Sequence, residues 1–124
     1  MKHKIIIAGG RKFRNYAFLK RKVDKFIGDL FERDDEIEIV SGAANGADQL
    51  GERFATEFGL ELTLFPADWN TWGPSAGYKR NKQMAEYATA CICFWDGKSK
   101  GTKHMIDLAK EYKLTLGIFK YTPK

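Results

Sequence analysis

Five short runs with the composition of β-strands alternate along the chain with segments of helical periodicity. The strand-like runs occupy residues 4–9, 36–41, 60–65, 90–95 and 114–119. Alternation of strands with helices of this length is typical of βαβ units, so we expect an α/β fold with a mainly parallel five-stranded sheet. The 124 residues contain no linker, low-complexity stretch or internal repeat, which predicts one domain over residues 1–124.

Helix boundaries are also marked in the sequence. Asn15 is expected to cap the first helix, because its side chain can accept from a first-turn N–H group. Gly59 is expected just past the end of the second helix, where the backbone favours glycine. The third helix is expected over residues 76–87.

The composition of the strands predicts their order. Ile5–Ala8 and Ala90–Trp95 are apolar throughout, as expected for central strands covered on both faces. Glu36–Ile39 and Leu60–Leu64 alternate between polar and apolar residues, as strands nearer an edge do. The predicted order is 3-2-1-4-5 with helices on both faces. In such a sheet, ligands bind outside the carboxyl ends of the strands, between strands 1 and 4.

Three glycine-rich turns follow strands and lead into helices, at residues 9–11, 42–48 and 96–102. Parallel strands end at one edge of the sheet, so the turns are expected to converge there. Glycine lets a ligand approach backbone N–H groups, and helix N-termini favour negative charge. The candidate ligand-binding residues come from these turns, from the strand end before the second turn and from the third helix. They are Gly10, Arg11, Ser41, Gly42, Gly46, Asp48, Arg80, Asn81, Gly97, Ser99, Gly101 and Thr102.

Several of these residues have structural alternatives. Arg11 can bind a phosphate or remain an exposed arginine, and Asp48 can bind ribose hydroxyls or favour the N-terminus of its helix. Backbone amides from Ser99 to Thr102 can form an anion-binding nest, with either hydroxyl capping the helix or binding a phosphate oxygen. The turns match neither a Walker loop nor a complete dinucleotide fingerprint, which disfavours a Rossmann dehydrogenase.

The longest irregular segment covers residues 65–81. Its aromatic residues Trp69, Trp72 and Tyr78 can stack on a base, form a small side core or serve a subunit interface. Arg80 and Asn81 enter the third helix on the same rim and can contact a phosphate or a base edge. Homo-oligomerisation stays open.

Catalytic patterns are weak, and no catalytic residue is assigned. Asp48, Asp68 and Asp96 can each act as acid or base, whereas His104 is expected on the surface or in packing.

The net charge of +5 and the pI near 9.2 permit an anionic partner without selecting one. Cys91 and Cys93 are expected on one side of a strand as buried free thiols, and no metal site or cofactor is expected. No apolar stretch reaches membrane-spanning length, so we expect a soluble cytoplasmic protein.

With these residues in view, the chain resembles the YspA-type, YpsA-related branch of the SLOG superfamily. Relatives include the "lonely guy" phosphoribohydrolases and the DNA-processing Smf/DprA proteins. The resemblance lies in five segments in order, Ala8–Phe13, Ser41–Asp48, Pro66–Trp69, Ala76–Met84 and Phe94–Thr102. It implies a Rossmann-like fold, a nucleotide-derived ligand and a phosphate contact at Arg80.

One position departs from the phosphoribohydrolases. Their Pro-Gly-Gly-x-Gly-Thr-x-x-Glu stretch supplies a glutamate for N-glycosidic cleavage, and Met105 occupies that position here. A thioether can neither relay a proton nor stabilise an oxocarbenium ion. We therefore expect binding of a nucleoside monophosphate or an ADP-ribose-like ligand by a sensor or sequestering module. The alternatives are a nucleotide N-glycosidase or phosphoribohydrolase using an Asp, and single-stranded nucleic-acid binding.

Overall fold

Five parallel strands form one sheet in the order β3-β2-β1-β4-β5. The computed structural model describes residues 1–122. The strands are β1 (Lys2–Gly9), β2 (Glu36–Ser41), β3 (Glu61–Leu64), β4 (Ala90–Trp95) and β5 (Thr115–Lys120). The helices are α1 (Tyr16–Leu30), α2 (Ala47–Glu57), α3 (Trp69–Trp72), the 3₁₀ turn η1 (Gly73–Ser75), α4 (Ala76–Tyr87) and α5 (Lys100–Glu111). The α/β class and the strand order are confirmed, and every strand pair is parallel.

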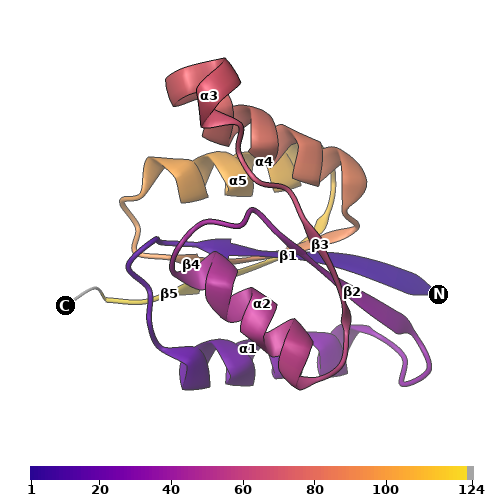
Figure 1. Cartoon of the computed structure of the whole chain (residues 1–124). Helices are drawn as coiled ribbons and strands as arrows, with labels where there is room; N and C mark the ends of the chain where they lie inside the picture. Colours follow the sequence, from indigo (N-terminus) through magenta and orange to yellow (C-terminus); the bar gives the residue numbers. More distant parts are fainter. Residues whose placement is uncertain (123–124) are drawn as a thin grey trace.

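Helices cover both faces of the sheet, with α1 and α2 on one side and α4 and α5 on the other (Figure 1). Alternate residues of β1 separate the two cores. Ile5 and Ile7 pack against the α1–α2 layer, whereas Ile6 packs against the α4–α5 layer. Because both faces of β1 and β4 are buried, these strands can be apolar throughout. The pattern of apolar residues along a strand therefore indicates whether the strand is central in the sheet or near its edge.

The predicted helix boundaries are largely confirmed. Asn15 caps α1, with its Oδ1 accepting from the N–H of Phe18 at 3.0 Å. Gly59 follows α2 with a φ of +65°, and α4 spans residues 76–87 as expected. β1 begins two residues earlier than expected, at Lys2.

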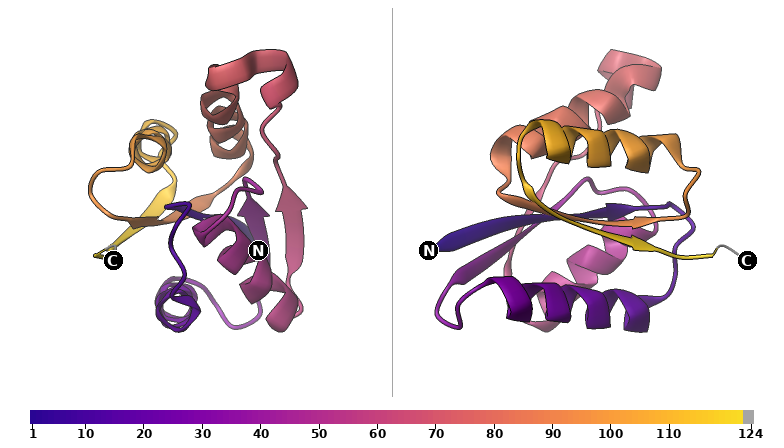
Figure 2. Two further views of the ribbon diagram at one scale, coloured as in Figure 1. Left: turned by 60° about the vertical axis from the view of Figure 1, so that its left-hand side comes forward. Right: turned by 180° about the vertical axis from the view of Figure 1, so that it is seen from behind.

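The segment expected to be irregular is partly helical. Asp68 caps the single turn of α3 by accepting from the N–H of Thr71 at 3.1 Å, and Pro74 lies in the first turn of η1. The Asp68 cap and the fixed φ of Pro74 stabilise these short helical turns. Each turn is too short to produce a periodic pattern of apolar residues in the sequence. The segment projects beyond the α4–α5 layer (Figure 2). No helix within residues 1–122 is long and apolar enough to cross a membrane.

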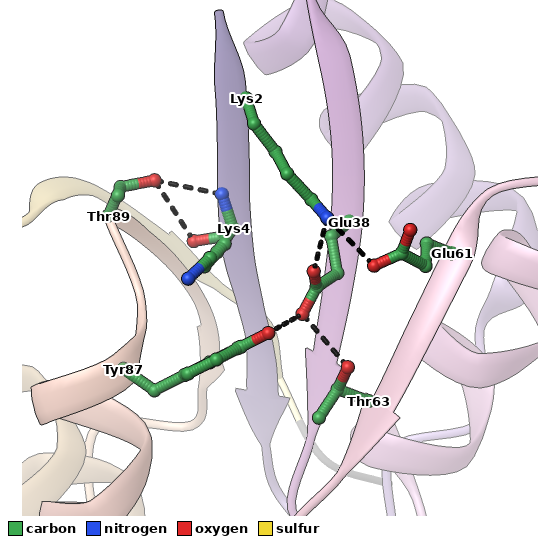
Figure 3. A network of polar contacts seen from close by, with 7 residues as sticks. All are labelled: Lys2, Lys4, Glu38, Glu61, Thr63, Tyr87 and Thr89. Carbon is green, nitrogen blue, oxygen red and sulfur yellow. Dashed lines mark hydrogen bonds and ion pairs between the residues drawn. The ribbon is translucent and has the colours of Figure 1, made fainter.

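A buried carboxylate extends from β2 on the face of the sheet that α4 and α5 cover. Glu38 has no exposed surface, and its Oε2 accepts from the hydroxyls of Thr63, at 2.9 Å, and Tyr87 (Figure 3). Its Oε1 lies 3.2 Å from the Nζ of Lys2. Burial opposes ionisation, but these hydroxyls and the ammonium outweigh it and lower the pKa of Glu38 to about 2. Glu38 therefore remains charged at neutral pH.

Candidate functional site

A cavity of about 470 Å³ opens at the carboxyl ends of β1 and β4, where the winding of the chain changes direction. Its walls come from the turns after β1 and β4, from α3 and η1, from α2, α4 and α5, and from the chain after β5. The residues that line it include Gly10, Arg11, Ala44, Asp48, Trp69, Tyr78, Arg80, Asn81, Asp96, Ser99, Gly101, Thr102, Met105 and Tyr121. Its size and its place at a topological switch point are typical of ligand sites.

A second cavity of about 340 Å³ lies beside the first, over the carboxyl ends of β2 and β3. It is lined by Arg11, Gly42, Ala43, Ala44, Asn45, Pro66, Ala67, Trp69 and Arg80. Arg11, Ala44, Trp69 and Arg80 belong to the walls of both cavities.

Arg80, near the start of α4, is half-buried and fixed by two hydrogen bonds. Its Nη1 donates to the backbone oxygen of Gly42, and its Nε donates to Oδ1 of Asn81 at 2.9 Å. Burial lowers the pKa of Arg80, the charge of Asp48 raises it, and the neighbouring Arg11 lowers it further. Arg80 is thus a positioned cation in the walls of both cavities.

Asn81 connects α4 with the beginning of α5. The side chain is buried, and its Nδ2 donates to the backbone oxygen of Gly101 at 3.4 Å and lies 3.2 Å from Nδ1 of His104. The His104 ring also packs edge-on against Tyr78, with ring centroids 4.5 Å apart. Of the two places expected for His104, the surface or packing, the half-buried ring takes the second.

Asp48 lies in the first turn of α2, with only 5% of its surface exposed. Its Oδ2 accepts from the N–H of Ala44 at 3.2 Å. Burial raises the pKa of Asp48 to about 6, although the Ala44 N–H and the charges of Arg80 and Arg11 oppose the rise. Asp48 therefore lies in the cavity wall with a pKa close to neutral, where a carboxyl group can exchange a proton.

The turn after β4 differs from an open anion nest. Oδ1 of Asp96 accepts from the N–H groups of Lys98 and Ser99, each at 2.8 Å, and Ser99 caps α5 through Thr102. The expected nest from Ser99 to Thr102 is therefore partly filled by the protein's own side chains. The N–H groups of Lys100 and Gly101 lie in the first turn of α5, where a helix supplies no acceptor.

Three predicted site residues lie outside the walls of both cavities. Ser41 is buried and donates to Glu52 at 2.7 Å. Gly46 has a φ of +81° where two turns cross, and a Cβ there would lie 2.2 Å from the backbone oxygen of Gly10. Gly97 has a φ of +85° in an open turn. Turn geometry explains both glycines without a ligand.

Some cavity residues were not expected from the sequence. Tyr121 follows β5 and lines the first cavity, with its ring 4.7 Å from that of Phe13. The place of Tyr121 could have been predicted from the sequence, because a residue directly after a parallel strand lies on the same rim as the glycine-rich turns. Among the acid–base candidates, Asp68 caps α3 and lies outside both cavities. Asp48 and Asp96 both line the first cavity, but the pKa is raised for Asp48 and lowered for Asp96, whose Oδ1 accepts from two turn N–H groups.

The fold and the cavity define a Rossmann-like α/β protein with a ligand-sized hollow at its switch point. The chain matches the family described as YspA, cpYpsA-related SLOG over residues 3–72 and belongs to that family. SLOG domains are nucleotide-related modules. The matched range excludes the Ala76–Met84 and Phe94–Thr102 segments, which form part of the cavity wall.

Two individual similarities extend further along the chain. The Gene 61 protein of Mycobacterium phage D29 is 30% identical over 114 residues, covering 87% of this chain and 89% of that protein. A solved structure described as a predicted subunit of tRNA methyltransferase from Methanocaldococcus jannaschii aligns with 99% of this chain and 67% of its own chain. Its sequence identity is 10% and the TM-score is 0.43, so no functional argument rests on it.

Proposed function

We propose that this chain binds a nucleotide or nucleotide-derived ligand, of the nucleoside monophosphate or ADP-ribose type, and acts as a sensor or sequestering module. The carrying observation is the pair of guanidinium groups of Arg11 and Arg80 in the wall of the switch-point cavity. Within residues 1–122, neither has a carboxylate oxygen within 4.0 Å. Guanidinium groups of this kind are suited to phosphate oxygens.

The surrounding wall supports the same ligand class. The first turn of α5 presents N–H groups and the positive end of the helix dipole, which favour an anion. Trp69 and Tyr78 line the cavity and are 48% and 45% exposed, so both are accessible aromatic side chains for stacking on a base. Phosphate recognition and a base platform are therefore available in one cavity.

Thermal denaturation with nucleoside monophosphates, cyclic nucleotides, NAD, ADP-ribose and ribose 5-phosphate tests the proposal. A ligand at roughly a thousand times its Kd stabilises the folded state by about 4 kcal/mol, a clear rise in Tm for a chain of this size. Arg80→Ala is expected to weaken binding of the selected ligand about 10- to 100-fold, because charge-assisted hydrogen bonds are lost. Lys82→Ala, an exposed residue of the same helix, serves as the control.

Unchanged affinity in a folded Arg80→Ala protein would contradict this placement of the phosphate. A flat response to the whole panel, with salt-sensitive binding of a single-stranded oligonucleotide, would replace the proposal with nucleic-acid binding.

Asp48 favours a second candidate, a nucleotide N-glycosidase. In such a reaction, water adds to the ribose C1′ and the base leaves with a proton, and Asp48 is the acid–base group that lines the cavity with a raised pKa. Met105 lines the same cavity and supplies no such group. Release of free base over time, abolished in Asp48→Asn, would favour hydrolysis; binding without release would leave the module as a binder.

A further inference from the structure

The two cavities share one partition. Arg11, Trp69 and Arg80 contribute to the walls of both, with the 470 Å³ cavity on one side and the 340 Å³ cavity on the other. The guanidinium of Arg11 lies 5.7 Å from the centre of the Trp69 ring, within the range of a cation–π contact. The Nη1 of Arg80 donates a hydrogen bond to the backbone oxygen of Gly42, which fixes the guanidinium in place. With Ala44, which also lines both cavities, the partition consists of one aromatic ring, two cations and one small residue.

Charge on this partition is not neutralised locally. Arg11 and Arg80 are close enough for the charge of Arg11 to lower the pKa of Arg80, and within residues 1–122 neither is in an ion pair. Asp48, the nearest acid acting on both, is itself buried and has a pKa near 6. Two like charges held together in this way favour an anion with several oxygens between them.

The second cavity has its own chemistry. It is lined by Pro66 and Ala67 after β3 and by Asn45 in the loop after β2, none of which lines the first cavity. Ala43 in this loop has a φ of +59°, a left-handed conformation that is rare for a residue with a Cβ. Such strain is frequent at ligand sites. A mononucleotide confined to the first cavity would leave this wall without a contact.

We propose that the ligand has two ends joined by a diphosphate, with the diphosphate at Arg11 and Arg80 and one end in each cavity. The ligand class is a dinucleotide or a nucleoside diphosphate sugar, and the inference rests on the proposed nucleotide binding. Tyr78 lines the first cavity and not the second, and beside Trp69 of the partition it places the nucleoside end in the first cavity. The sugar or second nucleoside then occupies the space between Ala67 and the loop after β2.

Isothermal titration with AMP, ADP and ADP-ribose tests this inference. ADP-ribose is expected to bind at least about 10-fold more tightly than AMP, because its second end adds contacts. Ala67→Leu narrows the second cavity and is expected to remove that advantage while changing the affinity for AMP less than about 2-fold. Asn45→Phe narrows the same cavity from the loop after β2 and is expected to have the same effect. Ala17→Leu, an exposed site on α1, is the matched control.

Arg11→Ala provides a second arm, because Arg11 is exposed and its loss leaves the core intact. The variant should lose more affinity for ADP and ADP-ribose than for AMP. Equal affinities for AMP and ADP-ribose, or an unaltered preference in both narrowed variants, would overturn the two-ended ligand and leave nucleotide binding standing. Absence of binding by all three probes, together with no stabilisation of the folded wild-type protein by any member of the wider nucleotide panel, would overturn both proposals.

Discussion

Two buried carboxylates, Glu38 and Asp48, are ten positions apart in the sequence and have opposite surroundings. Glu38 accepts two hydroxyl hydrogen bonds and forms an ion pair with Lys2, and these contacts lower its pKa to about 2. Asp48 accepts one backbone hydrogen bond and has arginines beyond ion-pair distance, and burial raises its pKa to about 6. A compensated buried charge stabilises the fold, whereas an undercompensated one at a cavity wall is suited to a ligand or a proton.

The two groups consequently affect stability in opposite directions as pH changes. The contribution of Glu38 is complete above its usual pKa of 4.5 and is lost as the pH falls toward about 2. Asp48 binds its proton more tightly in the folded state, so stability decreases as the pH rises from 3.8 to about 6. At neutral pH, ionised Asp48 therefore reduces the free energy of unfolding.

The largest effect is expected for Glu38→Ala. Tyr87, Thr63 and Lys2 lose their shared partner, and we expect the free energy of unfolding at pH 7 to fall by about 3 kcal/mol. Urea unfolding of wild type and variant measures the difference, which should narrow as the pH falls below 4.5. Glu36→Ala, exposed two positions earlier on the same strand, should change stability by less than about 0.5 kcal/mol. Equal losses of unfolding free energy in Glu38→Ala and Glu36→Ala would contradict the stabilising role of the buried Glu38 carboxylate.

A smaller effect of opposite sign is expected for Asp48→Asn. A rise in pKa from 3.8 to about 6 corresponds to about 3 kcal/mol, a net effect that already includes the attraction to Arg80, and we expect the variant to recover most of it, roughly 2 kcal/mol. The variant should be more stable than wild type at pH 7 and equal to it near pH 4 in urea titrations. Asp24→Asn on the exposed face of α1 is the control. A destabilised Asp48→Asn protein would mean that the charge is well compensated.

The smallest effect is expected for Tyr87→Phe, which removes one hydrogen bond from Glu38. A loss of about 1 kcal/mol is expected, together with a pKa of Glu38 closer to its usual value. Chemical denaturation gives the first quantity, and NMR titration of the Glu38 carboxyl gives the second. Tyr112→Phe is the matched control, since no hydroxyl hydrogen bond of Tyr112 is found in the described chain. An unchanged Glu38 pKa would assign its depression to Lys2 and Thr63 alone.

Strand order was predictable because burial on two faces leaves a mark in each strand, as in Ile5–Ala8 and Ala90–Trp95. The role of Glu38 was not predictable, because its partners at positions 2, 63 and 87 meet only in the folded sheet. Helix α3 was missed because four residues are too few for a periodic pattern.

The candidate site was predictable in position and less so in detail. Glycine-rich turns after β1 and β4 indicated the rim, and Arg11, Arg80 and Gly101 line the cavity there. Gly46 and Gly97 carried the same sequence signal for a different reason, since their positive φ favours glycine with or without a ligand. A glycine in a turn reports backbone conformation first and ligand approach second.

The central position of β1 also has a consequence for biosynthesis. Lys4 and Thr89, which are hydrogen-bonded beside the start of the β1–β4 pair, are 85 residues apart. A ribosome adding roughly 5–20 residues per second takes about 4–17 s to make that interval. Until β4 emerges, β1 can pair with β2 but has an apolar strand edge without its partner. Such edges associate readily with other chains, so the nascent protein is most vulnerable to misassociation before its fourth strand is made.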